Sequence, residues 1–382
     1  MRKTILLLLI LSVAYHVKSQ TSRNDLDFRA LLAAVKKLPS YKDQVGYNTK
    51  LNFKEEDFSF SEKDTDYDVF LKLYQLISPI RDNHLVLQSN RELPLEKPSI
   101  LEIPKATIDS AIKLANPNDS VAGTYYAGKY QLELVKINNE YIGAIENDGR
   151  YYTQFILREV TPNHFDRIWF ADQGKSYFVY RNTVFVNQRL SGTAWKKYKE
   201  SDFVSLPNGS PRYDFKMLGN DIAYLRLGGF GTSSESIAES IKFYNQLPII
   251  SAKTLIVDLR DNGGGGFKNS QKFLDLIRRF KGSIHVIINN NTVSNAEQIL
   301  IDLQKNPNVI TYGESTRGTI SYGNNVDTTI DLPSKRFSFY ITDMKARKQD
   351  IPFESYGIQP KIKLDPFKKD WIQQVADRIN TN

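Results

Sequence analysis

The 382-residue sequence contains no cysteine. This absence excludes disulfides, thiolate zinc sites, iron–sulfur clusters and a cysteine nucleophile. Beyond its N-terminal segment the chain also lacks any stretch of about 18 apolar residues and any internal repeat, so we expect neither stable membrane insertion nor a solenoid. The net charge is +8, but the basic residues are scattered and form no nucleic-acid-binding motif, so we expect no nucleic-acid partner. The remaining composition is typical of a globular protein with two or three domains.

The N-terminal segment resembles an export signal. Arg2 and Lys3 precede an apolar run from Ile5 to Ala14, and small residues follow at a spacing that suits a signal peptidase. A run of about ten residues is too short to span a bilayer of roughly 30 Å, and no cysteine follows it to accept a lipid. We therefore expect a cleaved signal over residues 1–19 and export to the periplasm or the outside. An uncleaved anchor is the alternative.

Hydrophobic periodicity divides the rest of the chain into three regions. From residue 20 to 120 apolar residues recur at helical spacing, which predicts an N-terminal helical region. From 121 to 205 the period changes to two, which predicts an antiparallel β module built from hairpins. From 206 to 382 strands and helices alternate, which predicts a mostly parallel sheet flanked by helices. The predicted fold class is therefore α/β, within a multidomain α+β chain.

Two strand ends in the third region carry residues that suit catalysis. The predicted strand 254–259 leads to Asn262 and four glycines, whose amides can bind an oxyanion or can simply form a flexible turn. The predicted strand 284–288 leads to Ser294, directly before a helix that begins at Asn295. A hydroxyl there can act as a nucleophile or can merely cap the helix. Because ligands collect at the carboxyl ends of parallel strands, both ends are expected at one site.

These segments resemble the core of the C-terminal-processing (tail-specific) and tricorn-core serine peptidases. The resemblance covers about residues 221–360 and implies a crotonase-like fold for the region 206–382. It implies that Ser294 attacks a peptide carbonyl, and that the amides of Asn295 and Gly264 form the oxyanion hole. It rests on Leu255–Gly265, Thr292–Glu297, Gly313–Gly318 and Tyr356–Pro360, the last followed by Lys361 where the family motif has an aspartate.

The identity of the general base depends on which branch of the family the chain resembles. One branch of the family uses a lysine at the position of Thr319, so that serine–lysine pair is absent here, and Lys335 and Lys345 stay open as substitutes. The tricorn-like branch uses a histidine, and His84 matches its Asp-x-His segment. An imidazole with a pKa near 6.5 can take the serine proton at neutral pH. By itself, a histidine at a helix end would more often be structural or solvated.

The other three histidines are not expected at the site, and Glu354 is the expected catalytic acid. His16 lies in the predicted signal, His164 in a predicted loop of the β module, and His285 inside a predicted strand, where a structural role is expected. Glu354 precedes Gly357 by three residues and matches the acid of the family. The resemblance implies that Glu354 fixes the imidazole tautomer, as the third member of a hydrolytic triad does. A surface glutamate is the alternative.

The sequence thus predicts an exported serine endopeptidase that acts on protein or peptide substrates and needs no metal or cofactor. The acyl-enzyme would form on Ser294 with His84 as the base. Residues 121–190 lack the glycine-rich carboxylate loop of the PDZ domain that many relatives carry. Together with the missing lysine, this absence leaves an inactive peptidase-like binding or scaffold protein as the alternative. A crotonase-like acyl-thioester enzyme is a weaker one, because acyl-thioester cofactors are generally intracellular.

Overall fold

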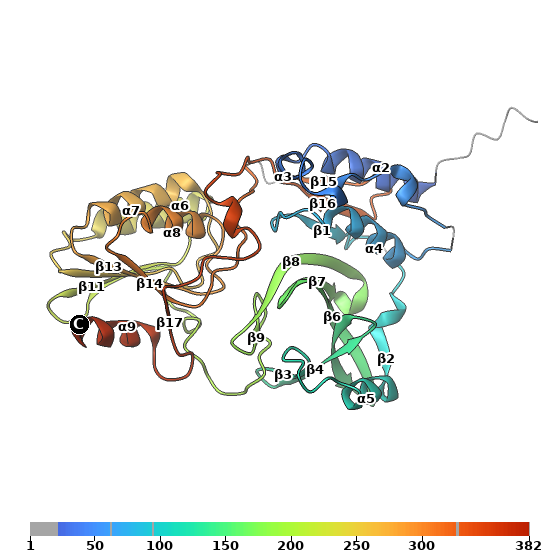
Figure 1. The fold of residues 1–382 in the computed structure, drawn as a ribbon, viewed down its shortest axis with the longest axis horizontal. Coiled ribbons are helices and arrows are strands. Elements are labelled where there is room, and N and C mark those ends of the chain that lie inside the picture. Colours follow the sequence, from blue (N-terminus) through green and yellow to red (C-terminus); the bar gives the residue numbers. More distant parts are fainter. Residues whose placement is uncertain (1–21, 62, 94, 326–327, 382) are drawn as a thin grey trace, which may run out of the picture.

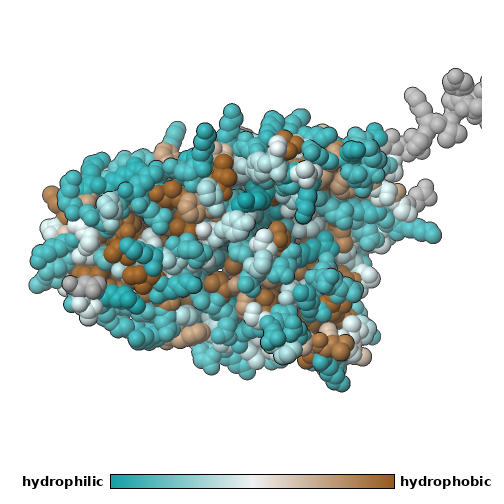
Figure 2. Space-filling view, viewed as in Figure 1, coloured by the Kyte–Doolittle hydropathy of each residue, from teal (hydrophilic) through white to brown (hydrophobic). Residues whose placement is uncertain are grey.

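The computed structural model describes residues 22–61, 63–93, 95–325 and 328–381 of this mixed α/β chain. The predicted export signal, residues 1–19, lies outside the described residues. Two sheets organise the molecule: a six-stranded, mostly parallel sheet with helices on its faces, and an eleven-stranded sheet whose strand pairs are all antiparallel (Figure 1). No helix of the described residues is long and apolar enough to cross a membrane. On the face in Figure 2, hydrophobic residues form small groups among hydrophilic ones.

The six-stranded sheet contains the alternating elements that the sequence predicts. Three helices cover one face of this sheet and one helix covers the other (Figure 1). The predicted strands and helices between residues 222 and 312 are confirmed to within about two residues at each end. In sheet order the strands are β10 (Tyr213–Met217), β11 (Ile222–Leu227), β12 (Thr254–Asp258), β13 (Ser283–Ile288), β14 (Val309–Gly313) and β17 (Ile362–Lys363); the helices are α6 (Ser234–Gln246), α7 (Phe267–Arg279) and α8 (Asn295–Leu303) on one face and α9 (Trp371–Thr381) on the other.

The central strands of the six-stranded sheet are buried because helices cover both of its faces. Every residue of β11 and β12 is buried. Helix α6 is an exception to this burial, since its Ile237 and Ile241 are 39% and 47% exposed. The helix contacts the core near its C-terminal end instead, through Phe243 and Tyr244. Its first turns therefore lie at the surface.

The antiparallel sheet takes strands from all three predicted regions. Its order is β15-β16-β1-β8-β7-β6-β5-β4-β3, with β2 paired to β6 and β9 to β8. The predicted boundaries at 120 and 205 therefore do not separate independent sheets, because short strands from both flanking regions join this one. His164 opens β7 and does not lie in a loop as expected. The strands are β1 (Val86–Ser89), β2 (Glu102–Pro104), β3 (Gly123–Ala127), β4 (Tyr130–Ile137), β5 (Glu140–Asn147), β6 (Arg150–Thr161), β7 (His164–Ala171), β8 (Ser176–Val186), β9 (Arg189–Leu190), β15 (Thr329–Asp331) and β16 (Phe337–Tyr340).

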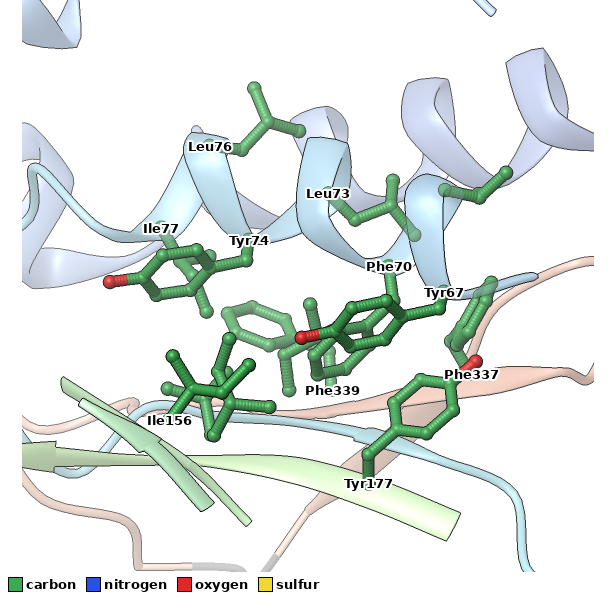
Figure 3. Close-up of a cluster of buried hydrophobic side chains, with 14 of the residues drawn as sticks. Tyr67, Phe70, Leu73, Tyr74, Leu76, Ile77, Ile156, Tyr177, Phe337 and Phe339 are labelled. Atoms are coloured by element: carbon green, nitrogen blue, oxygen red, sulfur yellow. The ribbon is translucent and has the colours of Figure 1, made fainter. Parts of the chain in front are cut away.

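The first three N-terminal helices of the described residues pack on the end of this sheet that contains β1 and β16, and the fourth contacts β2, β4 and β6. Figure 3 shows α4 directing Phe70 and Tyr74 toward Tyr177 and Phe339 of the strands below it. Buried Arg336 adds ion pairs to two aspartates of the N-terminal helices, which fixes the β15–β16 hairpin against them. The helices are α2 (Arg23–Val35), α3 (Pro39–Gln44), α4 (Asp66–Ile77) and α5 (Lys105–Lys113); 3-10 turns cover Thr49–Leu51, Glu55–Asp57, Ser99–Leu101, Asp172–Gly174 and Ile351–Phe353.

Candidate active site

Ser294 occupies a strained turn between β13 and α8. Its φ of 57° and ψ of −120° are rare for a residue other than glycine. Its amide donates to Glu297 Oε2 at 2.9 Å and to the Thr319 carbonyl at 2.9 Å. Its hydroxyl makes no cap hydrogen bond to its own helix. This conformation is typical of a nucleophile presented on a strand-to-helix turn, and it differs from an ordinary helix cap.

The structure brings His84 to Ser294 from the opposite end of the chain. His84 Nε2 lies 3.3 Å from Ser294 Oγ. The histidine lies two residues before β1, where its amide donates to buried Asp82 Oδ1 at 3.2 Å. The other oxygen of Asp82 accepts the Thr342 hydroxyl at 2.7 Å. Burial lowers the pKa of His84 below its usual 6.5, against the opposing charge of Asp82. The imidazole is therefore neutral at pH 7 and can accept a proton.

Glu354 does not take the position that the resemblance implied. Its Oε1 accepts the amide of Asn83 at 2.8 Å. Its Oε2 accepts the amides of Ile320 and Ser321 at 2.9 and 2.8 Å. His84 Nδ1 is enclosed and has no hydrogen-bond partner among the described residues, so Glu354 does not hold the imidazole directly. It holds the backbone beside the imidazole instead, and burial raises the pKa of Glu354 to about 7.

The glycine turn after β12 lies against Ser294, but the amide of Gly264 is occupied. Gly264 N donates to Asn262 Oδ1 at 2.9 Å, which removes it as the oxyanion donor that the resemblance implied. Its φ is +83°, and a Cβ there would lie 2.7 Å from the Val293 carbonyl and 2.9 Å from Ser294 Cβ. Glycine is therefore required for close approach. The amide of Asn295 is the first of α8, so it has no acceptor within the helix.

Glu297 is a functional residue that the sequence interpretation missed. This fully buried carboxylate accepts four hydrogen bonds. Oε1 accepts the Thr316 hydroxyl at 2.6 Å and the Gly318 amide at 2.7 Å. Oε2 accepts the amides of Ser294 at 2.9 Å and Thr319 at 3.1 Å. Glu297 therefore joins the Ser294 turn to the loop that follows β14. An acid three residues after a residue that precedes a helix is the signal that could have identified it.

The carboxyl ends of β12 and β13 are joined by polar side chains. Asp258 and Arg260 form an ion pair at 2.7 Å in which both side chains are fully buried. Asp261 accepts hydrogen bonds from the side-chain amides of Asn289 and Asn291 at 2.8 and 3.0 Å. These contacts hold the glycine turn and the Ser294 turn at one edge of the sheet.

The remaining candidates lie apart from this pair. His285 Nδ1 lies 3.0 Å from the Tyr312 hydroxyl inside the sheet, as its predicted structural role requires. His164 Nδ1 lies 2.8 Å from Asn182 Oδ1. Lys335 lies in the turn between β15 and β16, and neither it nor Lys345 forms a hydrogen bond to the Ser294 hydroxyl. Within the part of the chain that the structure describes, no three histidine or acidic residues form a group that could hold a metal ion.

Comparison with known proteins gives one family match. The model of peptidase family S41 matches residues 221–279. Among solved structures, the photosystem II D1 C-terminal processing protease is 15% identical, with 91% of this chain and 94% of that chain covered and a TM-score of 0.40. CPAF complexed with lactacystin is 11% identical, with 94% and 97% covered and a TM-score of 0.42. A lipoprotein from Streptococcus agalactiae is 19% identical, with 45% and 70% covered and a TM-score of 0.33. No curated protein matches the chain.

The structural likenesses are too low to support an inference about this chain. The family match stands independently of them, and it covers β11, β12, the glycine turn and α7. Residues 221–279 of this chain are therefore similar to peptidase family S41, and the sequence motifs resemble the same serine-type peptidases.

Proposed function

We propose that the chain is an exported serine endopeptidase that forms an acyl-enzyme on Ser294. The observation that carries the proposal is the 3.3 Å approach of His84 Nε2 to Ser294 Oγ, between residues 210 positions apart. In unliganded enzymes such contacts are often longer than in the substrate complex. The neutral imidazole takes the serine proton during attack on the peptide carbonyl and returns it to the leaving amine.

Backbone amides at the carboxyl edge of the sheet stabilise the oxyanion in this proposal. The Asn295 amide supplies one donor, at the positive end of the α8 dipole. Gly264 is replaced as the second donor by a neighbouring amide of the turn, that of Gly263 or Gly265. We assign the six-stranded sheet to the crotonase-like class on its sequence motifs.

The acids around His84 act in different ways. To accept a proton at Nε2, the imidazole must carry its hydrogen on Nδ1. The negative charge of Asp82 favours the imidazolium that forms during attack. Glu354 acts indirectly, since its bond to the Asn83 amide sets the backbone that carries the histidine. It is therefore a positioning residue.

Export remains part of the proposal on the strength of the N-terminal sequence alone. The basic pair and the short apolar run of residues 1–19 support it. The match of residues 221–279 to a peptidase family supports protein or peptide substrates.

A fluorophosphonate probe tests the mechanism, because its reaction requires an activated serine hydroxyl. We expect the wild-type protein to be labelled and Ser294→Ala to remain unlabelled. His84→Ala should slow labelling by about 10²–10⁴-fold. Ser110→Ala changes an exposed serine of α5 and serves as the matched control. A folded wild-type protein that resists the probe contradicts the proposal and favours the inactive binding protein.

A further inference from the structure

Two arginines near the candidate site have no carboxylate partner. No carboxylate oxygen of the described residues lies within 4.0 Å of the guanidinium group of Arg167 or Arg317. Arg167, on β7, is only 4% exposed, and its Nε and Nη1 are enclosed without any hydrogen-bond partner. Only its Nη2 donates a hydrogen bond, to the Gly192 carbonyl at 3.3 Å.

Other buried arginines of the same sheet have the ion-pair partners that Arg167 lacks. Arg181 pairs with Asp166 at 3.0 Å and donates to backbone carbonyls that include that of Ile77, at 3.0 Å. Arg189 pairs with buried Glu314. A buried charge ordinarily requires such compensation, because an uncompensated buried charge destabilises the folded state. Arg167 receives only partial compensation, from aromatic rings.

Both guanidinium groups lie against Gly192. The position that a Cβ on Gly192 would occupy is 3.3 Å from Arg317 Nη2, and its φ is +64°, so glycine leaves the space that the arginine fills. Burial and the neighbouring charge of Arg317 lower the pKa of Arg167 to about 10. Two like charges therefore share one enclosed region, where their repulsion is strong.

This region adjoins the Ser294 turn. The Arg317 amide donates to the Thr292 carbonyl at 3.3 Å, and its Nη2 donates to Asn291 Oδ1 at 2.9 Å. Both acceptors belong to the segment that leads to Ser294. The guanidinium of Arg167 lies 4.9 Å from the ring of Tyr180, which is 44% exposed, so a half-exposed side chain separates Arg167 from solvent.

We propose that Arg167 and Arg317 form a subsite that binds a carboxylate of the peptide substrate, an inference that rests on the proposed peptidase function. Guanidinium groups bind carboxylates through paired, charge-assisted hydrogen bonds, and Arg167 has two nitrogens free to donate them. The carboxylate can come from an acidic side chain or from the free C-terminus of the peptide. Either source supplies a carboxylate within ion-pair distance, which the described residues do not provide for Arg167 or Arg317.

Binding to the Ser294→Ala protein tests the subsite without hydrolysis. Four fluorescent peptides of one sequence combine an internal glutamate or glutamine with a free or amidated C-terminus, and anisotropy gives their dissociation constants. We expect one carboxylate source to bind at least tenfold more tightly than its neutral counterpart. A preference for glutamate assigns an acidic side chain, and a preference for the free terminus assigns a C-terminal carboxylate. Equal binding of all four peptides, or binding of none, overturns the inference.

Neutralising Arg167 should abolish the preference while stabilising the fold. In the Ser294→Ala background, Arg167→Met is expected to lose the tenfold discrimination and to raise the melting temperature, because it removes an uncompensated buried charge. Arg167→Lys should retain part of the discrimination. Arg158→Met removes an arginine that already forms an ion pair with Glu140, and this variant should keep the full tenfold discrimination. A merely structural Arg167 would give the reverse: a lower melting temperature with discrimination intact.

Failure of this inference and failure of the proposed function are distinguishable. Probe labelling of Ser294 without carboxylate discrimination supports the peptidase function and contradicts the subsite. Discrimination by a protein that resists the probe leaves a carboxylate-binding protein without catalysis.

Discussion

Replacement of Glu297 by glutamine tests which hydrogen bonds hold the Ser294 turn. The carboxylate accepts four hydrogen bonds, three from backbone amides and one from the Thr316 hydroxyl. A glutamine side chain keeps one acceptor oxygen, so two of the four bonds are lost and its NH₂ group faces donors. At about 1.5–3 kcal/mol for each bond to a charged group, the loss is about 3–6 kcal/mol. Removal of a buried charge offsets part of it, because burial raises the pKa of Glu297.

We therefore expect Glu297→Gln to destabilise its region by about 3 kcal/mol. For a unit of this size that corresponds to a melting temperature lower by roughly 6–12 °C. Fluorophosphonate labelling should slow as well, since the side chain that links the Ser294 turn to the loop after β14 loses two of its four hydrogen bonds. Glu239→Gln changes a half-exposed carboxylate of α6 and is the matched control. A Glu297→Gln protein that melts like the wild type and is labelled at the same rate would refute the reasoning.

Three further outcomes follow from the site. Labelling should fall as the pH drops through the pKa of His84, which lies below 6.5, because only the neutral imidazole accepts a proton; a rate–pH profile with its midpoint above that value contradicts this. The folded pKa of Glu354, about 7, exceeds the ordinary 4.5, so the folded state binds the proton more tightly than the unfolded chain. The resulting stabilisation of the folded state, about 3 kcal/mol, is fully present below pH 4.5 and is lost as the pH rises through about 7. Between pH 5 and 8 the melting temperature of the wild type should therefore fall relative to that of Glu354→Gln. Gly264→Ala should cost about 2 kcal/mol and abolish labelling, because its backbone is left-handed and the added Cβ meets the Ser294 turn, whereas Gly46→Ala has open space around it and should cost little.

The parallel sheet could be predicted because its signals are local. Each strand from β11 to β14 pairs with the next one along the chain, and the intervening helices show their own period. The β15–β16 hairpin could not be assigned in this way. Its partner β1 lies about 250 positions earlier, and a strand of four residues has too little pattern to indicate a distant partner.

The candidate site was predictable in its residue types and less so in its hydrogen bonds. The approach of His84 to Ser294 agrees with the family motifs, and their catalytic roles stay predictions until the probe is used. The amide of Gly264 is occupied by Asn262 because of the turn's own conformation, which the glycine run does not encode. Glu354 likewise points to three backbone amides that only the folded loops bring together.

The interlaced antiparallel sheet has a consequence during synthesis. His84 is anchored two residues before β1, whose outer edge is completed by β16. A nascent chain that ends before residue 329 already contains both His84 and Ser294 but lacks β16, which pairs with β1 beside His84. Under the proposed mechanism, products that terminate before β16 are therefore expected to be inert, and activity is expected only once translation is nearly finished.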